Sequence, residues 1–436
     1  MTTPIVDFIR EYNSKKPLRL HTPGHKGKGF SGFYKYDITE CCGADELFVS
    51  SGIIAESEKN ASEIFGTPTY YSAEGSSLCV RAMLYLIAQR CGGKPVIVAA
   101  RNAHKSFLYG AALVGAEVIW LPPHKNDTYV SCTVTAEDVG RALSDNKADA
   151  VFITTPDYLG KTTDIKEISA VCKKHGVILA VDCAHGAYLH FTGNPSYPTD
   201  SGADLCCSSA HKTLPALTGA AYLHVNCGIP ADEVKASMSA FASTSPSYLI
   251  LASLDRLNPY LPTLKKRLKT FIPQVERAKK ALCEAGYTLY GDEPLKITLD
   301  AAEYGYSGFE IEQFLIKNNI YPEYADGDYI TFMVSTETGR QGLDILRSAL
   351  LKLPKRDRKE KNLPRLILPQ KAVSIRDAFF AAKESLPTEF CAGRVLSDMN
   401  VSCPPAVCPV VCGEIIDEKM IPYLKSIGID RLSVVR

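Results

Sequence analysis

The stretch DLCCSSAHKTLPALTGAAYLHV, residues 204–225, decides the fold class of this chain. It begins with an apolar run, continues through a polar segment that contains Lys212, and ends in a second apolar run. Short apolar runs of this kind are typical of strands that are buried on both faces. Lys212 therefore follows the end of a buried strand, where open α/β sheets place their ligands. Taken alone, the pattern also fits a surface lysine beside a capping serine or threonine.

The same alternation extends on the N-terminal side of this stretch. Further strand-like runs lie at 69–73, 95–100, 117–121, 150–155 and 177–182. Helical candidates between and before them lie at 55–66, 76–91, 106–115 and 164–176. Buried strands that alternate with helices predict an α/β fold with a mainly parallel sheet.

The second half of the chain has a different organisation. Residues 255–285 predict a long charged helix that is interrupted by its prolines. LKITLD (295–300), FEIEQFLIKNN (309–319), YITFMVS (329–335) and a helix near 340–352 follow, and this order indicates a smaller α+β domain. The charge-dense segment PKRDRKEKNLP fits a solvated linker. After it comes a helical segment, SIRDAFFAAKES (374–385), and then a Pro- and Cys-rich stretch.

These patterns divide the chain into five predicted parts. They are an N-terminal segment (1–54), a large domain (55–260), a small α+β domain (261–353), a charged linker (354–364) and a C-terminal α+β segment (365–436).

Composition limits the possible partners. The 436 residues include 49 Lys and Arg against 48 Asp and Glu, a net charge of +1, which argues against a nucleic-acid-binding protein. No apolar run approaches the roughly 18 residues of a membrane helix. The N-terminal residues lack the apolar core of a signal peptide, so we expect a cytoplasmic protein.

The 15 cysteines raise the alternatives of disulfides, a metal site or buried thiols. No CxxC spacing occurs, and the densest group, Cys403, Cys408 and Cys412, has no neighbouring histidine. We therefore predict no metal site and expect reduced, largely buried cysteines.

Two features upstream of Lys212 suggest a charged cofactor. Asp182 ends the apolar run VILAVD, and a carboxylate at the end of a buried strand is costly unless it meets a positive partner. A protonated pyridine nitrogen is one such partner. Gly75, Ser76 and Ser77 begin an apolar helix, where free N–H groups and hydroxyls suit a phosphate. A simple helix N-cap would explain the same residues.

His104 adds a fourth feature, because it follows the strand-like run PVIVAA. A single histidine there is more often structural, but its imidazole could also stack on a flat cofactor ring. The chain order is a phosphate loop, a stacking histidine, a strand-end aspartate and a strand-end lysine, and together these predict a site for pyridoxal 5'-phosphate.

Several motifs resemble the Orn/Lys/Arg decarboxylases, particularly their short bacterial arginine or lysine decarboxylase members. The similar segments span nearly the whole chain and are LHTPGHKGKGF (20–30), DITE (37–40), SAEGSS (72–77), ARNAHKS (100–106), VDCAHGA (181–187), SSAHKTLPALTGAAYLHV (208–225), STSPSYLILASLD (243–255), AGR (392–394) and CPPAVCPVVCGEII (403–416). The resemblance implies an aspartate-aminotransferase-like large domain (PLP fold type I).

The resemblance also implies roles for individual residues around the cofactor. Lys212 would form the Schiff base with His211 beside it, and Asp182 would pair with the pyridine nitrogen. His185 would lie near the phenolic oxygen or the substrate, and His104 would stack on the ring. Ser76, Ser77 and Ser209 would contact the phosphate, with His211 as a further contact.

Other implied roles concern the substrate and the partner subunit. In the family the active site lies between two subunits of a homodimer or larger homo-oligomer, so Ser245, Ser247 and Tyr248 would complete a neighbour's site. A Pro-initiated turn before a helix would explain this trio equally well. The candidates that would receive the substrate's distal cation are Asp45, Glu46 and Asp398, although each could be an ordinary surface carboxylate.

The chain departs from the family pattern at several positions. Cys183 stands where a Glu is usual, but strand neighbours face opposite ways, so the role of Asp182 is retained. Glu74 stands where an Asn is usual and either adds a negative charge near the phosphate or points away. Asp157 lies in an altered Thr-Thr-Pro-Asp-Tyr run, and Cys403 replaces a frequent Tyr.

The resemblance implies α-decarboxylation of arginine, lysine or ornithine to an amine of polyamine metabolism. One alternative is an aminotransferase or aldolase, and Arg394 is the C-terminal arginine that could hold a substrate carboxylate for it. Another is a catalytically silent homologue with an interaction or regulatory role.

Overall fold

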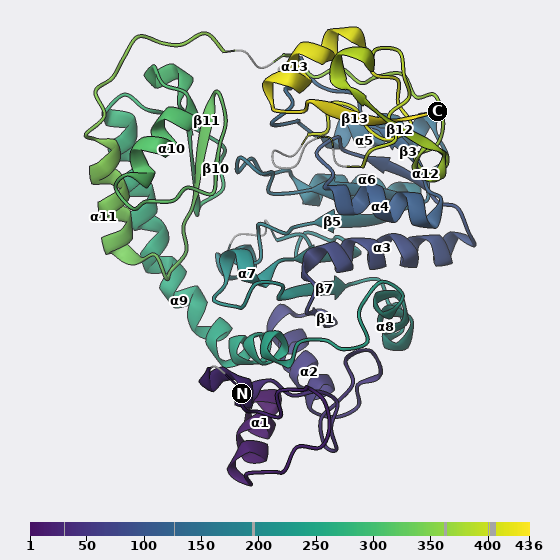
Figure 1. The fold of residues 1–436 in the computed structure, drawn as a ribbon, viewed down its shortest axis with the longest axis vertical. Helices are drawn as coiled ribbons and strands as arrows, with labels where there is room; N and C mark the ends of the chain where they lie inside the picture. Colours follow the sequence, from purple (N-terminus) through teal and green to yellow (C-terminus); the bar gives the residue numbers. More distant parts are fainter. Residues whose placement is uncertain (30, 126, 194–196, 362–363, 400, 402–406) are drawn as a thin grey trace. The chain divides into compact units, whose positions relative to one another are not determined.

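The computed structural model describes residues 1–436 except 30, 126, 194–196, 362–363, 400 and 402–406. The described chain forms two compact units (Figure 1). Unit 1 comprises Met1–Gly93, Asp149–Val151 and Ile165–Lys265, and unit 2 comprises Lys94–Ala148, Phe152–Asp164 and Lys266–Arg436. The five predicted parts stay predictions.

Unit 1 carries the segments around Lys212. Its helices are α1 (Pro4–Ser14), α2 (Ile53–Phe65), α3 (Gly75–Cys91), α6 (Ile165–His175), α7 (Ala210–Thr213) and α8 (Ala231–Ser239). Its strands are β1 (Thr69–Ser72), β5 (Ile178–Asp182), β6 (Leu205–Ser208) and β7 (Ala221–Val225), and its short 3-10 turns are η1 (Gly32–Tyr36), η2 (Leu47–Val49) and η3 (Leu189–Phe191).

Unit 2 contains the remaining elements. The first group is β2 (Val96–Ala99), α4 (Lys105–Val114), β3 (Glu117–Trp120) and α5 (Ala136–Asp145). The second group is β8 (Thr288–Tyr290), β9 (Lys296–Asp300), η4 (Ala302–Tyr304), α10 (Gly308–Ile316), β10 (Tyr324–Ala325), β11 (Tyr329–Met333) and α11 (Gly339–Leu350). The third is α12 (Ile375–Phe380), β12 (Lys383–Pro387), η5 (Thr388–Phe390), η6 (Glu418–Met420), α13 (Ile421–Ser426) and β13 (Arg431–Val435). β4 (Ala150–Thr154) and α9 (Tyr248–Glu284) have residues in both units.

The large sheet has the strand order β1-β7-β6-β5-β4-β2-β3. β5 and β6 run parallel, as do β2 and β3, whereas β7 pairs antiparallel with both β6 and β1. Smaller sheets have the orders β10-β11-β9-β8 and β12-β13. The predicted α/β fold with a large, mostly parallel sheet is confirmed.

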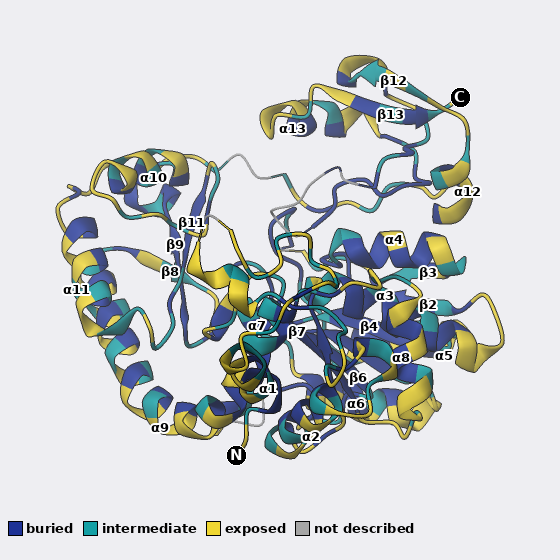
Figure 2. Ribbon diagram, turned by 60° about the horizontal axis from the view of Figure 1, so that its bottom comes forward, coloured by how far each residue is buried: buried dark blue, intermediate teal, exposed yellow. Residues whose placement is uncertain are grey.

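Helix α3 forms the centre of the unit 1 core. It packs on β1, β5, β6 and β7, and α8 packs on it in turn. Leu78, Val80, Leu84 and Ile87 are fully buried, because a helix that is apolar around most of its circumference must be enclosed. Figure 2 shows the same distinction, with the sheet strands dark blue and the surface helices partly yellow.

Two predictions about helices are wrong: the prolines do not interrupt the long helix, and the helix predicted at 374–385 is shorter. Helix α9 runs without a break through Pro259, Pro262 and Pro273. Each internal proline destabilises a helix by about 3 kcal/mol. Buried apolar side chains at helical spacing along α9, which include Leu257 and Leu261, offset this cost, because each contributes about 1.5–3 kcal/mol.

The predicted helix at 374–385 instead ends at Phe380. Lys383–Pro387 forms β12, and its antiparallel partner β13 supplies the backbone hydrogen bonds that a longer helix would have made.

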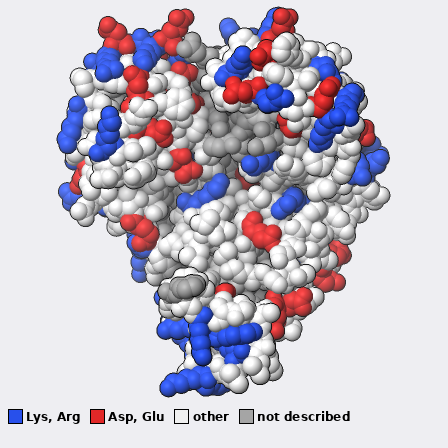
Figure 3. Space-filling view, viewed as in Figure 1, with Lys and Arg blue, Asp and Glu red and all other residues white. Residues whose placement is uncertain are grey.

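Charged side chains of both signs are interspersed on the face seen in Figure 3. The N-terminal segment carries a group of basic residues, namely Lys15, Lys16, Arg19, Lys26, Lys28 and Lys35. Within the described chain, no helix combines the length and apolarity needed to cross a bilayer.

Candidate active site

Lys212 and His185 meet at the carboxyl ends of two adjacent parallel strands. Lys212 lies in α7 directly after β6, and His185 follows β5. The Nζ atom of Lys212 lies 3.0 Å from Nε2 of His185, so the ammonium donates to the imidazole. His185 is buried, whereas Lys212 is exposed. The pair therefore presents an amine to solvent with a buried proton acceptor beside it.

Asp182 ends β5 and is only 3% exposed. Its Oδ1 atom accepts the N–H of Ala184 at 3.0 Å and faces the thiol of Cys207 at 3.5 Å. No Lys, Arg or His of the described chain forms an ion pair with it. Burying a carboxylate without a cation is costly, so this position suits a ligand that carries a positive charge.

The start of α3 forms a polar cradle. The hydroxyl of Ser209 donates to that of Ser76 at 2.9 Å, which joins the segment after β6 to the first turn of α3. The N–H of Gly75 donates to the carbonyl of Gly219 at 2.7 Å and holds the turn in place. This 17-residue helix directs its remaining N-terminal N–H groups, which include that of Ser77, toward the cradle. Hydroxyls at a helix N-terminus suit a phosphate.

His211 is oriented by its own backbone neighbourhood. Its Nδ1 atom lies 2.9 Å from the carbonyl oxygen of Ala220, so Nδ1 carries the proton and donates. In the neutral ring, Nε2 is then an acceptor.

His104 belongs to unit 2, where it is the N-cap of α4. Its Nδ1 atom accepts the N–H of Ser106 at 3.2 Å and lies 2.8 Å from the hydroxyl of the same residue. These bonds orient the ring, and its stacking on a cofactor stays a prediction.

The residues proposed for the substrate's distal cation have other contacts. Asp45 is buried and accepts the N–H groups of Ser51, Gly52 and Ile54 at 2.8–3.0 Å, so it caps the start of α2. Glu46 is exposed and lines a cavity that does not include Lys212.

Asp398 and Arg394 lie in unit 2 and are bound to the C-terminal strand. Asp398 accepts the N–H of Ser433 at 2.6 Å. Arg394 donates to Glu384 at 2.5 Å and to the carbonyl of Val435 at 2.8 Å. Their predicted substrate roles therefore gain no support from these contacts.

The residues predicted to complete a neighbour's site surround the start of α9. Tyr248 is fully buried and its hydroxyl donates to the carbonyl of Asp45 in its own chain. Ser247 accepts the N–H groups of Ile250 and Leu251 through its carbonyl, and Ser245 is exposed. Only Ser245 thus presents an exposed side chain, and the shared site stays a prediction.

The departures from the family pattern have clear local contacts. Glu74 accepts the N–H of Ser243 at 2.7 Å, which binds its carboxylate to the segment before α9.

Cys183 is fully buried and its thiol contacts that of Cys206. Asp157 accepts from the Ser131 hydroxyl and the Lys161 N–H at 2.8 Å each, and its burial raises the pKa of its carboxyl. Cys403 lies outside the described residues.

The comparison with known families decides the identity of the chain. Residues 3–289 match the model of the major domain of Orn/Lys/Arg decarboxylases. The chain belongs to the Orn/Lys/Arg decarboxylase family. Membership in this family identifies it as an amino-acid decarboxylase, and the predicted family is confirmed.

Relatives of this decarboxylase cover most of its length. Arginine decarboxylase of Bacillus subtilis is 28% identical, over 97% of this chain and 93% of that protein. Lysine decarboxylase LdcA of Pseudomonas aeruginosa is 23% identical, over 58% of this chain and 39% of that protein.

Solved structures confirm the fold type. Lysine decarboxylase A from Pseudomonas aeruginosa superposes with a TM-score of 0.82 at 19% identity, over 97% of this chain and 76% of that one. Serine palmitoyltransferase of Sphingomonas wittichii superposes with a TM-score of 0.55 at 17% identity, over 71% of this chain and 78% of that one.

Two residues of this decarboxylase escaped the sequence reasoning. Cys207 contacts Asp182, and only the pairing of β5 with β6 reveals that the two are opposite each other. Arg101 is 2% exposed and forms two hydrogen bonds with Glu414, at 2.7 and 2.6 Å. It also lies 4.9 Å from the Trp120 ring centre. Its place in the ARNAHKS motif, three residues before His104, was the available signal.

Proposed function

We propose that this protein uses pyridoxal 5'-phosphate to decarboxylate a basic amino acid, either arginine, lysine or ornithine, to the corresponding amine. The observation that carries the proposal is the buried carboxylate of Asp182, which has no cationic partner in the described chain. Asp182 ends β5, and the adjacent strand β6 leads directly to Lys212. A protonated ring nitrogen would supply the missing charge.

The residues present fit the cofactor. Lys212 would hold its aldehyde, Asp182 its ring nitrogen, and Ser76, Ser77 and Ser209 its phosphate. When bound, the cofactor supplies an electron sink for the pair released as the Cα–carboxylate bond breaks.

The side chains of the protein supply the proton handling. Lys212 must lose a proton before its amine can act as a nucleophile, and Nε2 of His185 lies 3.0 Å away to accept it. Nε2 of His211 remains able to hold a proton for delivery to the substrate, because Nδ1 is committed to Ala220. The negative charge of Asp182 is held in place by Ala184 and Cys207.

Among the three amino acids we place arginine first. Relatives named arginine decarboxylase from Bacillus subtilis and Bacillus anthracis align over 97% of this chain, whereas the biodegradative arginine decarboxylase of Escherichia coli and lysine decarboxylase LdcA of Pseudomonas aeruginosa each align over 58% of it. The amine product would enter polyamine metabolism. We further propose a cytoplasmic homodimer or larger homo-oligomer, as for the family pattern, with Ser245 presented to the partner.

The alternatives of transamination or aldol cleavage receive less support. The Arg394 guanidinium, the candidate for holding a substrate carboxylate, is already bound to Glu384 and Val435. A silent homologue is disfavoured because Lys212, Asp182 and the serine cradle occur together.

A product assay tests the proposal. The purified protein, loaded with pyridoxal 5'-phosphate, is incubated separately with arginine, lysine and ornithine, and amine, keto acid and carbon dioxide are quantified. We expect amine and carbon dioxide in equal amounts from one substrate, and no turnover by Lys212→Ala. Formation of a keto acid, or full turnover by Lys212→Ala, would overturn it.

A further inference from the structure

A second cavity lies within unit 1, apart from the proposed cofactor site. It has a volume of about 990 Å³ and is walled by η2, α2, β1 and α8. None of Lys212, Asp182, His185 or Ser76 lines it. The volume lies at the upper end of the range of roughly 300–1,000 Å³ found for small-molecule sites. The cavity can therefore hold a ligand of its own.

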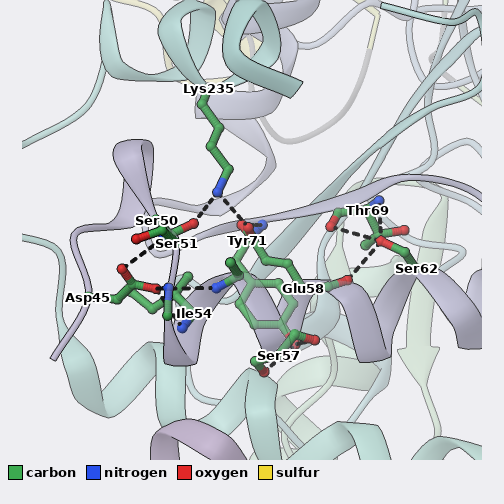
Figure 4. A network of polar contacts seen from close by, with 12 residues as sticks. Asp45, Ser50, Ser51, Ile54, Ser57, Glu58, Ser62, Thr69, Tyr71 and Lys235 are labelled. Carbon is green, nitrogen blue, oxygen red and sulfur yellow. Dashed lines mark hydrogen bonds and ion pairs between the residues drawn. The ribbon is translucent and has the colours of Figure 1, made fainter. Parts of the chain in front are cut away.

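A neutralised ion pair between Lys235 and Glu58 belongs to the lining of the cavity, and Figure 4 shows its contacts. Lys235 of α8 and Glu58 of α2 are 9% and 6% exposed, and Nζ lies 2.9 Å from Oε2. The other carboxylate oxygen of Glu58 accepts the N–H of Tyr71 at 3.0 Å, and Lys235 also donates to the Ser50 hydroxyl. Since both charges are satisfied, this pair shapes the site without adding net charge.

The wall of the cavity carries an unused hydroxyl. Tyr70 of β1 lines the cavity and is 8% exposed. Its phenolic oxygen has no hydrogen-bond partner in the part of the chain that the structure describes and is not itself fully buried, so a ligand in the cavity can reach it. The negative charges of Glu58 and Asp232 act on this hydroxyl and, after burial, help to raise its pKa. The Tyr70 hydroxyl is thus available to a ligand in the cavity.

The rim of the cavity is acidic. Glu46, Glu63 and Asp232 line it, and none of them forms an ion pair or hydrogen bond with another described residue. Lys235 is neutralised by Glu58, so Lys59 is the positive charge that remains among the described lining residues to balance these three carboxylates. Phe48 and Tyr70 add aromatic surface. Carboxylates combined with aromatic faces attract organic cations.

We propose that this cavity is an accessory binding site for a small organic cation, with an ammonium or guanidinium head and an aliphatic stem. The stem would lie against Phe48 and Tyr70, and the cationic head would be held by Glu63 and Asp232, with the Tyr70 hydroxyl accepting a hydrogen bond from it. The site goes beyond the proposed activity, because it is separate from Lys212 and needs no cofactor.

Calorimetric titration tests this proposal on the full-length Lys212→Ala protein, whose changed residue does not line the cavity. The probes are agmatine, cadaverine and putrescine. The informative variant adds Glu63→Gln/Asp232→Asn, which removes two charges at the rim. The matched control adds Glu276→Gln/Glu284→Gln, which removes two exposed charges on α9 outside the cavity.

We expect at least one probe to bind with an affinity that falls at least tenfold in the rim variant and stays within twofold in the control. Tyr70→Phe, which retains the ring, should weaken the same event about threefold. Equal binding by the rim variant and its parent, binding of inorganic phosphate in place of the cations, or no binding of any probe would overturn the proposal. The amine assay on the wild-type protein is separate, so failure of either proposal leaves the other readable.

Discussion

The Sγ atom of Cys207 lies 3.5 Å from the Oδ1 atom of Asp182, on the strand next to it. The N–H of Ala184 reaches the same oxygen at 3.0 Å. Both donors therefore act on one carboxylate oxygen, and Oδ2 has no partner in the described chain. The thiol is fully buried, and its burial together with the nearby Asp182 charge raises its pKa well above the usual range, so it stays protonated and can donate.

Removing this thiol should weaken cofactor binding without unfolding the protein. Cys207→Ala loses a hydrogen bond worth about 1 kcal/mol, so the dissociation constant for pyridoxal 5'-phosphate should rise roughly fivefold. Cys207→Ser keeps a donor and should remain within about twofold of the parent. Fluorescence titration of the cofactor measures both constants. Equal affinities for the alanine and serine variants would contradict a hydrogen-bonding role.

The charge of Asp182 should matter more than its shape. Asp182→Asn is nearly isosteric but cannot neutralise a protonated ring nitrogen. A charge-assisted hydrogen bond contributes about 1.5–3 kcal/mol, so decarboxylation should fall roughly 10- to 150-fold. Circular dichroism should be unchanged. Activity within twofold of the parent would show that Asp182 does not face the ring.

Gly219 should be required for the phosphate cradle. Its φ is +97°, and an added Cβ would lie 2.9 Å from the carbonyl oxygen of Ala73. Gly219→Ala should displace the carbonyl that holds Gly75 and weaken cofactor binding roughly 5- to 150-fold, since such strain costs about 1–3 kcal/mol. Gly66→Ala is the matched control, because Gly66 also has a positive φ (+65°) but meets no atom within 4 Å. A similar loss of cofactor affinity in both variants would contradict the steric argument.

His224 should make the fold sensitive to acid. Burial, with a smaller contribution from His190, lowers the pKa of His224 to about 3. His224 therefore binds a proton below about pH 6.5 in the unfolded chain but stays neutral in the folded chain. The free energy of unfolding consequently falls as the pH drops below about 6.5. The slope from this group approaches 1.4 kcal/mol per pH unit.

Thermal unfolding of His224→Gln between pH 7 and 5 measures this contribution. The variant should lose the slope that His224 adds, although it will be less stable at pH 7 because Thr69 and Tyr197 lose a partner. An unchanged slope would place the acid sensitivity elsewhere.

Asp255 should act in the opposite direction. It accepts the N–H of Val6 at 3.0 Å and the hydroxyl of Ser57 at 2.6 Å, and thereby caps α1 from α9. Burial raises its pKa to about 6. The folded state then binds a proton more readily than the unfolded chain, so the stability from this group is present below about pH 4 and is lost as the pH rises through 6.

Asp255→Asn should remove that pH dependence, because the amide stays neutral, so α1 should be equally protected at every pH. Limited proteolysis near residues 4–14, followed from pH 5 to 7, measures the effect. Cleavage that speeds up between pH 5 and 7 as much as in the parent would show that the ionisation of Asp255 does not control the helix.

Local pattern was sufficient for the strands and for the order of the site residues. The runs that end in Asp182 and Ser208 predicted β5 and β6, and the start of the apolar helix at Gly75 predicted α3. Such features depend on periodicity and on neighbouring residues. The prolines of α9 led to a wrong prediction of breaks in that helix. Their local energetic cost is outweighed by the burial of apolar side chains of α9 against residues distant in sequence.

The sequence by itself determined the α/β fold, the family and the chain order of the cradle, Asp182 and Lys212, since each rests on a contiguous segment. Only the tertiary structure decided which neighbours these side chains have. It placed Cys207 against Asp182, bound Glu74 to Ser243, made Asp45 the cap of α2, and placed Tyr70 in the lining of an acidic cavity. These contacts join residues between 7 and 169 positions apart, and strand pairing and burial set them rather than any local preference.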